Sequence, residues 1–229
     1  MGGGLGKLFL CVLALSTANS SPRMSVHVVE HPLIATRLSI MRAKTTGTEE
    51  FRRTLQEVSL LLLTEAARTW PVVSISLETP LRACEGCRLA APVVLVPILR
   101  AGLGMVDGML QLLPEASVGH LGLYRDEKTL RPVSYYRRLP RGLAGAEVLL
   151  LDPMLATGYS ASEAVTVLKS HGARSIRFVC LVACPEGLAQ LQSAHPDVPI
   201  VAAAVDTGLN EVGYILPGLG DAGDRYFGT

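Results

Sequence analysis

Four stretches of the chain are hydrophobic at almost every position instead of at every second position. They cover residues 92–99, 147–151, 176–183 and 199–205. A strand with one face in water alternates apolar and polar side chains, whereas a strand covered on both faces is apolar throughout. The four stretches therefore predict buried strands of a parallel sheet.

Segments in which apolar residues recur at helical spacing separate these strands. Residues 103–113, 161–170 and 188–194 each follow one strand and are expected to be helices. A longer helix is expected at residues 49–69, and residues 46–49 resemble a capping box at its start. This alternation predicts an α/β fold, a parallel sheet flanked by helices. Ligands bind such sheets at the carboxyl ends of the strands, so we expect the functional residues in the loops that follow them.

One segment departs from the alternation of strands and helices. Residues 118–124 and 133–139 have the composition of two strands around a polar tip at residues 126–129. They predict an antiparallel β-hairpin that projects from the sheet. Such a hairpin could form an edge or subunit contact, or it could act as a flap over an active site.

Composition limits the classes of function. The chain has 229 residues, and 49% of them are hydrophobic, which is enough for one large domain. Its 21 basic and 20 acidic side chains leave a net charge of +1, which argues against binding nucleic acid through a broad positive surface. Cys84 and Cys87 form a single CxxC pair without the further ligands that a structural zinc needs. We interpret them as ordinary thiols in a surface turn.

The loop after residues 147–151 is the strongest local candidate for a phosphate site. The strand runs into Asp152, and small or hydroxyl residues at positions 156–160 precede a helix. The unpaired backbone N–H groups and the dipole at a helix N-terminus favour a bound phosphate. Asp152 could accept hydrogen bonds from sugar hydroxyls. A plain strand-to-helix turn with a good N-cap would look similar, so both interpretations stay open on these residues alone.

Two arginines stand where an anionic ligand could use them. Arg100 follows the strand at residues 92–99, and Gly102 and Gly104 allow a tight turn beside it. The planar guanidinium group offers several donors to phosphate oxygens. Arg125 lies near the tip of the expected hairpin. Each arginine could equally be an exposed, solvated cation.

The C-terminal segment, residues 209–229, combines many glycines with apolar side chains such as Ile215 and Leu219. A frayed tail would not need those apolar residues, so the segment predicts a winding loop with accessible backbone. Backbone N–H and C=O groups can pair with a ring that carries imide and carbonyl groups. Tyr214 or Ile215 could cover the flat face of such a ring.

Together these segments resemble the type I phosphoribosyltransferases, and among them the uracil phosphoribosyltransferases. The run Asp152-Pro-Met-Leu-Ala-Thr-Gly158 is similar to the family's loop for phosphoribosyl pyrophosphate (PRPP). Residues 96–104 are similar to its pyrophosphate loop, and residues 209–229 to its C-terminal signature. The resemblance covers roughly residues 26–229. It implies transfer of the 5-phosphoribosyl group of PRPP to uracil, which gives UMP and pyrophosphate, with the C-terminal loop as the base-binding loop.

The resemblance also implies roles for individual residues. The catalytic set would be Arg100, Arg125, Asp152 and Asp221. The PRPP-binding residues would be Arg100, Arg125, Asp152, Pro153, Met154, Leu155, Ala156, Thr157, Gly158, Tyr159, Ser160 and Asp221. Uracil would contact Tyr214, Ile215, Gly220, Asp221 and Ala222. Magnesium prefers oxygen ligands and keeps several waters, so we expect Mg²⁺ to arrive with PRPP and no metal site made by the protein alone.

Tyr159 is the one notable departure from the family pattern, because TGGS becomes TGYS. A side chain there could crowd the phosphate if the backbone needs a positive φ. We expect the side chain to point outward. The same position motivates an alternative function, a catalytically weakened or regulatory paralogue that binds PRPP or a nucleotide. A phosphoribosyltransferase for a different base and a secreted interaction protein are the remaining alternatives.

The resemblance further implies the kinds of partner. The substrates would be the small molecules uracil and PRPP, with neither nucleic acid nor a membrane as a partner. A homodimer or a higher homo-oligomer is expected. Some relatives are activated by a nucleotide such as GTP, and the sequence does not decide whether this chain binds one.

Residues 1–23 look unlike the remainder of the chain. Lys7 precedes an apolar run at residues 8–15, and residues 18–20 resemble a signal-peptide cleavage site. The run is too short to span a bilayer as a helix. We favour an upstream extension followed by a phosphoribosyltransferase domain at residues 24–229 in the cytoplasm, because PRPP metabolism belongs inside cells. Export through residues 1–20 stays the alternative.

Overall fold

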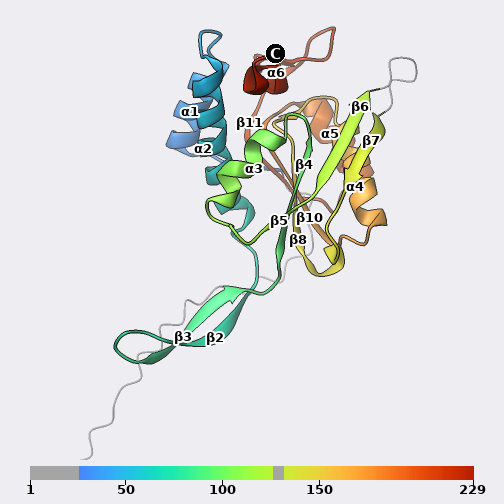
Figure 1. Ribbon diagram of the computed structural model, residues 1–229. Helices are drawn as coiled ribbons and strands as arrows, with labels where there is room; N and C mark the ends of the chain where they lie inside the picture. Colours follow the sequence, from blue (N-terminus) through green and yellow to red (C-terminus); the bar gives the residue numbers. More distant parts are fainter. Residues whose placement is uncertain (1–25, 126–131) are drawn as a thin grey trace, which may run out of the picture.

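The computed structural model describes residues 26–125 and 132–229 and has the predicted α/β architecture, a largely parallel sheet between two layers of helices (Figure 1). The main sheet contains β1 (Val26–Val28), β4 (Val93–Leu99), β5 (Ser117–Val118), β6 (His120–Arg125), β7 (Pro132–Arg138), β8 (Glu147–Leu151), β9 (Met154–Leu155), β10 (Ser175–Ala183) and β11 (Ile200–Val205). Two small ladders lie outside it, β2 (Val72–Glu78) with β3 (Ala83–Leu89), and β12 (Gly208–Leu209) with β13 (Ile215–Leu216). The helices are α1 (Pro32–Arg42), α2 (Thr48–Ala66), α3 (Leu103–Leu110), α4 (Tyr159–Ser170), α5 (Pro185–Ala194) and α6 (Ala222–Phe227), with a short 3-10 turn at Leu143–Gly145.

The strands of the main sheet follow the order β1-β11-β10-β8-β4-β6-β7. Every neighbouring pair along this path is parallel except β6 and β7, which are antiparallel. The carboxyl ends of β4, β8, β10 and β11 therefore meet at one edge of the sheet, next to α6 at the top of Figure 1. This is the edge at which an α/β sheet binds its ligands.

The continuous hydrophobicity of the strands is explained by two separate cores, one on each face of the sheet. Along β8, Leu149 and Leu151 pack into the core under α1, α2 and α3. The intervening Val148 and Leu150 pack into the core under α4 and α5. Successive side chains of a strand point to opposite faces, so a strand between two cores needs an apolar residue at every position.

The long helix at residues 49–69 is confirmed as α2, but the predicted capping box is wrong. The residue at the N-cap is Gly47, which has no side chain to cap with. Thr46 instead donates its hydroxyl to the carbonyl oxygen of Ile40 at 2.6 Å, across the turn between α1 and α2. The helix also ends earlier than predicted, at Ala66, before the turn that leads to Trp70.

The helices after the strands are confirmed, with shifted ends. Helix α4 begins at Tyr159 rather than residue 161, and α5 begins at Pro185 rather than residue 188. Proline is well suited to the first turn of a helix, because the N–H that it lacks would have no partner there. Helix α3 ends at Leu110 instead of residue 113.

The predicted hairpin is present as β6 and β7, but it continues the sheet instead of standing apart from it. Strand β6 pairs in parallel with β4, where Ile98 and Leu99 oppose Leu121 and Gly122. Strand β7 pairs with β6 and forms the edge of the sheet. The tip at residues 126–131 lies outside the described residues.

A second hairpin, formed by β2 and β3, was not predicted. It stands clear of the body in Figure 1, and we call residues 72–89 the arm. Cys84 and Cys87 lie on β3 of the arm, so their assignment to a surface turn was wrong. Residues three apart on a strand point to opposite faces, and both are free thiols.

In the part of the chain that the structure describes, none of the helices is both long enough and apolar enough to cross a lipid bilayer. Residues 1–23, which the sequence sets apart, lie outside the described residues.

Candidate active site

A cavity of about 250 Å³ opens at the carboxyl edge of the sheet, between the end of β8 and the C-terminal loop. It brings together two segments that are about sixty residues apart in the chain and that the sequence predicted to share a site. The lining residues are Ala101, Asp152, Met154, Ala156, Gly213, Tyr214, Ile215, Gly220, Asp221, Ala222 and Gly223.

Asp152 follows β8 directly and lies at the floor of this cavity. Its Oδ1 accepts a hydrogen bond from the Met154 backbone N–H at 3.4 Å. The pKa of the Asp152 carboxyl is raised from 3.8 to about 7, chiefly by burial and to a smaller extent by the nearby Asp221 carboxylate, while the hydrogen bond from the Met154 N–H acts to lower it. A carboxyl group that ionises near neutral pH in a cavity is a typical feature of a functional site.

The predicted phosphate loop lies at the start of α4. Gly158 is the N-cap and has φ +78°, and Tyr159 is the first helical residue. A Cβ at position 158 would lie 2.6 Å from the carbonyl oxygen of Gly187. The left-handed backbone and the close contact with α5 therefore require glycine at position 158 and not at position 159.

The Tyr159 side chain points away from the cavity that holds Asp152. It is 48% exposed and lines a shallow surface hollow of about 400 Å³ with Glu186 and Gln190 of α5. The expectation that Tyr159 points outward is confirmed. Thr157 borders the same hollow.

Pro153 and Leu155 belong to the framework behind the phosphate loop. Both side chains are buried, and that of Leu155 packs into the core under α4 and α5. The Pro153 carbonyl oxygen accepts the Leu181 and Val182 N–H groups, and the Leu155 carbonyl oxygen accepts the N–H of Cys184 at 3.2 Å. The side chains of both residues are therefore withheld from a ligand, and Pro153 has no backbone N–H to offer one.

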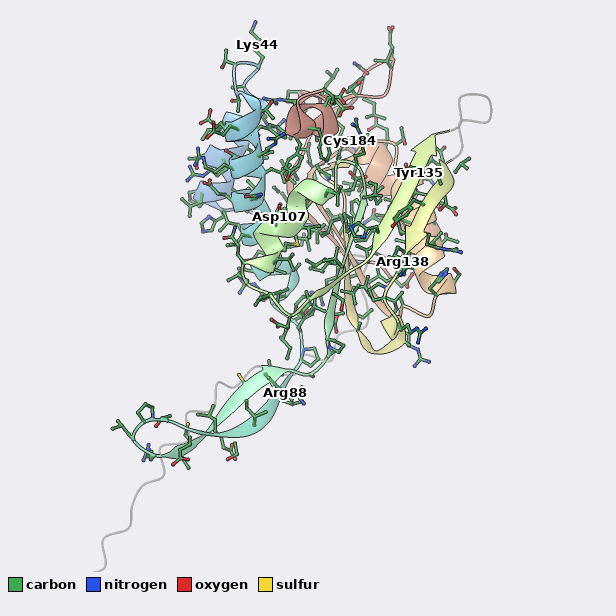
Figure 2. The ribbon with its side chains drawn as sticks, in the orientation of Figure 1. Lys44, Arg88, Asp107, Tyr135, Arg138 and Cys184 are labelled. Atoms are coloured by element: carbon green, nitrogen blue, oxygen red, sulfur yellow. The ribbon has the colours of Figure 1, made fainter. Side chains whose placement is uncertain are left out.

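Cys184 supports the same loop from below. Its buried Sγ lies 3.0 Å from the carbonyl oxygen of Ala156, which it faces as a donor. Figure 2 shows Cys184 near the carboxyl edge of the sheet, close to α6. Burial raises the pKa of the Cys184 thiol, so it stays protonated and acts as a small packing residue.

Arg100 lies in the turn after β4, beside the cavity-lining Ala101. Its Nη2 donates to Asp224 Oδ1 at 3.2 Å, and its guanidinium carbon lies 5.4 Å from the centre of the Phe227 ring. Both partners belong to the C-terminal helix α6. The Arg100 side chain is 56% exposed, so it is accessible to an anionic ligand from solvent.

Arg125 ends β6, on the strand next to the one that leads into Arg100. Its backbone therefore extends beyond the carboxyl edge of the sheet on the side of Arg100. The Arg125 side chain lies outside what the structure describes.

The C-terminal segment is folded against the core and is not a frayed tail, as predicted, but the expectation of a loop throughout was wrong, because β13 and helix α6 lie within it. Ile215 is 4% exposed and packs into the core, whereas Tyr214 is 47% exposed at the mouth of the cavity. Asp221 is the N-cap of α6, and its Oδ1 accepts the N–H of Asp224 at 2.9 Å. The second carboxylate oxygen of Asp221 has no role in that cap and is available to a ligand.

Four charged residues around this loop were missed by the sequence reasoning: Arg42, Asp206, Asp224 and Arg225. Asp206 had a usable signal, because it directly follows β11 at the carboxyl edge of the sheet. Arg42 had none, because arginine is common in the last turn of any helix. Asp224 and Arg225 lie in the tail, but their spacing alone does not indicate partners.

Among the described residues, no group of three or more His, Cys, Asp or Glu side chains is arranged to hold a metal ion. The carboxylates of Asp152 and Asp221 both border the cavity. They could contact a cation that a ligand brings with it, because oxygen ligands suit Mg²⁺ and most of its coordination sphere can remain water or phosphate.

Comparison with known proteins gives a consistent result. The family model for uracil phosphoribosyltransferase matches residues 28–229. The chain is 54% identical to a uracil phosphoribosyltransferase of Clostridium perfringens over 203 residues, which cover 88% of this chain and 97% of the relative. It is 55% identical to the enzyme of the same name from Ligilactobacillus salivarius over 203 residues, with the same coverage of both chains.

Among solved structures, the chain is similar to the AQ2163 protein of Aquifex aeolicus. The TM-score is 0.85 at 39% sequence identity, and the alignment covers 89% of this chain and 98% of the other. The similarity therefore extends over nearly the whole described fold.

Proposed function

The chain belongs to the uracil phosphoribosyltransferase family, and we propose that the cavity between Asp152 and the C-terminal loop is the site where it joins uracil to the phosphoribosyl group of PRPP. The products are UMP and pyrophosphate. The observation that carries this assignment is the cavity lining, which joins Asp152 at the end of β8 to Ile215 and Asp221 from the tail. The carboxyl group proposed to bind the sugar and the candidate base pocket thus share one cavity.

The reaction forms a bond between a uracil ring nitrogen and the anomeric carbon of the ribose. The bond from that carbon to the pyrophosphate oxygen breaks, and the nitrogen loses its proton. Positive charge develops on the ribose as pyrophosphate leaves, so the protein must orient both reactants and neutralise the leaving group. No covalent intermediate with a side chain is required.

We assign the ribose and its 5′-phosphate to the loop after β8. Asp152 would accept hydrogen bonds from the ribose hydroxyls, for which its carboxylate form is the better acceptor. The start of α4 at Thr157, Gly158 and Ser160 would hold the 5′-phosphate. The first backbone N–H groups of that helix and its dipole support this role.

We assign the leaving pyrophosphate to Arg100 and Arg125. Both follow strands at the carboxyl edge of the sheet, and the strands that carry them are neighbours. One guanidinium nitrogen of Arg100 donates to Asp224, and the side chain stays largely exposed, which suits a group that must meet a highly charged ligand. PRPP would enter as its magnesium complex, in which the cation offsets part of the pyrophosphate charge.

We assign uracil to the C-terminal loop. Backbone groups around Gly220 and Ala222 would pair with the polar edge of the base, and Tyr214 or Ile215 would cover its face. Asp221 would contact PRPP through the oxygen that does not cap α6. A non-catalytic paralogue is not favoured, because the Tyr159 side chain, which motivated it, points away from the cavity.

The test is formation of labelled UMP from labelled uracil, PRPP and Mg²⁺, beside cytosine, hypoxanthine and orotate. We expect turnover with uracil alone. An Asp221→Asn variant keeps the N-cap acceptor of α6 but loses the charge, so kcat/KM should fall about ten- to a hundredfold at unchanged Tm. Equal turnover of cytosine would contradict the assignment of the base, and full activity of Asp221→Asn would contradict the role of Asp221.

We also propose that the enzyme is a homodimer held through the arm. Strand β2 alternates, with Val73, Ile75 and Leu77 on one face, a pattern typical of a strand with one covered face. Val73 is 37% and Leu77 38% exposed, and Leu81 at the tip is 94% exposed. A two-stranded hairpin is only marginally stable alone in water, so a second copy of the chain is the proposed cover.

For the region before the described fold, we propose that residues 1–23 are an extension outside the phosphoribosyltransferase domain at residues 24–229 and that the enzyme works in the cytoplasm. The match of the family model to residues 28–229 is compatible with that boundary. The mass of the protein isolated from its own cells tests this, since cleavage after residue 20 would instead indicate export.

A further inference from the structure

A buried ion pair lies behind the base-binding loop. Arg42, the last residue of α1, donates from Nη1 and Nη2 to the two carboxylate oxygens of Asp206, each at 2.7 Å. The side chains of Arg42 and Asp206 are 25% and 7% exposed. A bidentate pair with so little solvent around it holds its geometry more firmly than a surface ion pair.

The ion pair binds both backbone polar groups of Gly218. Arg42 Nη1 donates to the Gly218 carbonyl oxygen at 2.6 Å, and the Gly218 N–H donates to Asp206 Oδ2 at 2.8 Å. Gly218 has φ +59°, and a Cβ on it would lie 2.1 Å from the carbonyl oxygen of Ile215. The chain is thus folded back tightly onto Ile215, which lines the cavity, and the ion pair secures that turn.

Arg225, on helix α6, binds Leu219, the residue that follows Gly218. Its Nη1 donates to the Leu219 carbonyl oxygen at 2.7 Å and also to that of Met41. Its Nη2 donates to the Ala43 carbonyl oxygen at 2.9 Å, and the guanidinium carbon lies 4.5 Å from the centre of a phenylalanine ring on α2. One arginine therefore reaches from α1 to the loop, and the other reaches from α6 back to the end of α1.

We propose that Arg42, Asp206 and Arg225, which we call the loop clasp, are positioning residues for uracil recognition. The proposal rests on the proposed function. None of the three is among the described residues that line the cavity, so they act through Gly218 and Leu219. A base that is read by loop backbone groups is recognised only while that backbone stays in place, and a small displacement is enough to weaken it. Loosening the clasp should therefore weaken uracil binding more than PRPP binding.

The experiment compares Arg42→Lys and Asp206→Asn with a control, Arg177→Lys. Lysine keeps the positive charge but cannot serve two carboxylate oxygens and a carbonyl in the same planar geometry. Arg177 is matched to Arg42 because it is half-buried and also anchors a helix end, donating to the carbonyl oxygen of Ala66 and to Thr69 Oγ1. It lies near the start of β10, at the opposite edge of the sheet.

Three quantities are measured on each full-length variant: the KM for uracil, the KM for PRPP, and hydrogen exchange of the backbone amides at residues 215–222. For Arg42→Lys and Asp206→Asn, we expect the KM for uracil to rise about tenfold, the loss of roughly one charge-assisted hydrogen bond. The KM for PRPP should change less than about threefold, and exchange of the loop amides should accelerate. Arg177→Lys should lower Tm without altering the ratio of the two KM values.

Equal increases in both KM values, or a lower Tm with both KM values unchanged, would show a merely structural role and overturn the proposal. The exchange measurement separates this outcome from failure of the proposed function. If the wild type does not turn over uracil, the proposed function is wrong, and the clasp is then judged on exchange alone. In that case the proposal is overturned if the amides of residues 215–222 are as well protected from exchange in Arg42→Lys as they are in Arg177→Lys.

Discussion

Asp152 illustrates at the residue scale how a site residue acts against the stability of the fold. It lies at the end of a buried strand, where a carboxylate loses most of its hydration. Under the proposed function, the same burial would give the ribose a well-placed acceptor once a substrate fills the cavity. The unliganded protein therefore carries a carboxyl group with a pKa near 7 that the bound ligand is expected to compensate.

Asp152→Asn should raise the stability of the unliganded protein at neutral and alkaline pH while it abolishes turnover. The pKa of Asp152 is raised from 3.8 to about 7. The protonated carboxyl group therefore contributes fully to the free energy of unfolding below pH 4, and this contribution is lost as the pH rises through 7. At about 1.4 kcal/mol per pKa unit, ionisation of Asp152 lowers the free energy of unfolding by at most about 4 kcal/mol. The check is Tm against pH for both proteins. A Tm difference that is the same at pH 4 and pH 8 would contradict the assigned cause.

Substitution of Gly158 should impair PRPP binding and stability strongly, whereas substitution of the neighbouring Tyr159 should have little effect. Tyr159→Gly should change the KM for PRPP less than about threefold, because the ring faces α5. Gly158→Ala should raise that KM at least tenfold and lower stability by about 1–2 kcal/mol, because alanine is strained at φ +78°. It also meets the Gly187 carbonyl oxygen. Steady-state kinetics and thermal melts test both variants. A larger effect of Tyr159→Gly than of Gly158→Ala would contradict the conclusion that position 158, and not position 159, requires glycine.

At the element scale, the helices and the central strands were recognisable from pattern, but the ends of α2, α3, α4 and α5 were displaced by two to three residues. Helix α2 is capped by no side chain at Gly47, because Thr46 turns to α1 instead. The arm was missed because the alternating pattern of Val73, Ile75 and Leu77 is short and lies between two stronger patterns, those of helix α2 and strand β4. In Figure 2 Arg88 marks the arm, and Tyr135 and Arg138 mark the far edge strand, β7.

The dimer proposal predicts that charges on the arm dissociate the protein. A Leu77→Glu, Leu81→Glu variant should sediment as a monomer at micromolar concentration, whereas the wild type sediments as a dimer, because two buried carboxylates oppose association. Leu112→Glu is the control, since Leu112 is 51% exposed on the body. A monomeric wild type would refute the proposal. Dissociation by Leu112→Glu as well would show that the arm is not the specific contact.

At the scale of the whole molecule, the sheet and its helices follow from sequence because burial on both faces imposes an unbroken apolar run. Residues 147–151 and 176–183 were predicted in this way and are β8 and β10. The loop after β8 and the C-terminal segment both lie at one edge of the sheet, as expected, because all parallel strands end there. That these loops close one cavity of about 250 Å³ was visible only in the fold.

The sequence by itself determined the fold class, the family and the segments that meet at the site, since these depend on local periodicity and on contiguous motifs. Only the tertiary structure decided where Tyr159 points, which glycine needs the left-handed backbone, and how Arg42 and Asp206 hold Gly218. Arg42 and Gly218 are far apart in the chain, and no local pattern records such a contact. Its existence depends on α1 packing beside the end of β11, which is a consequence of the whole core.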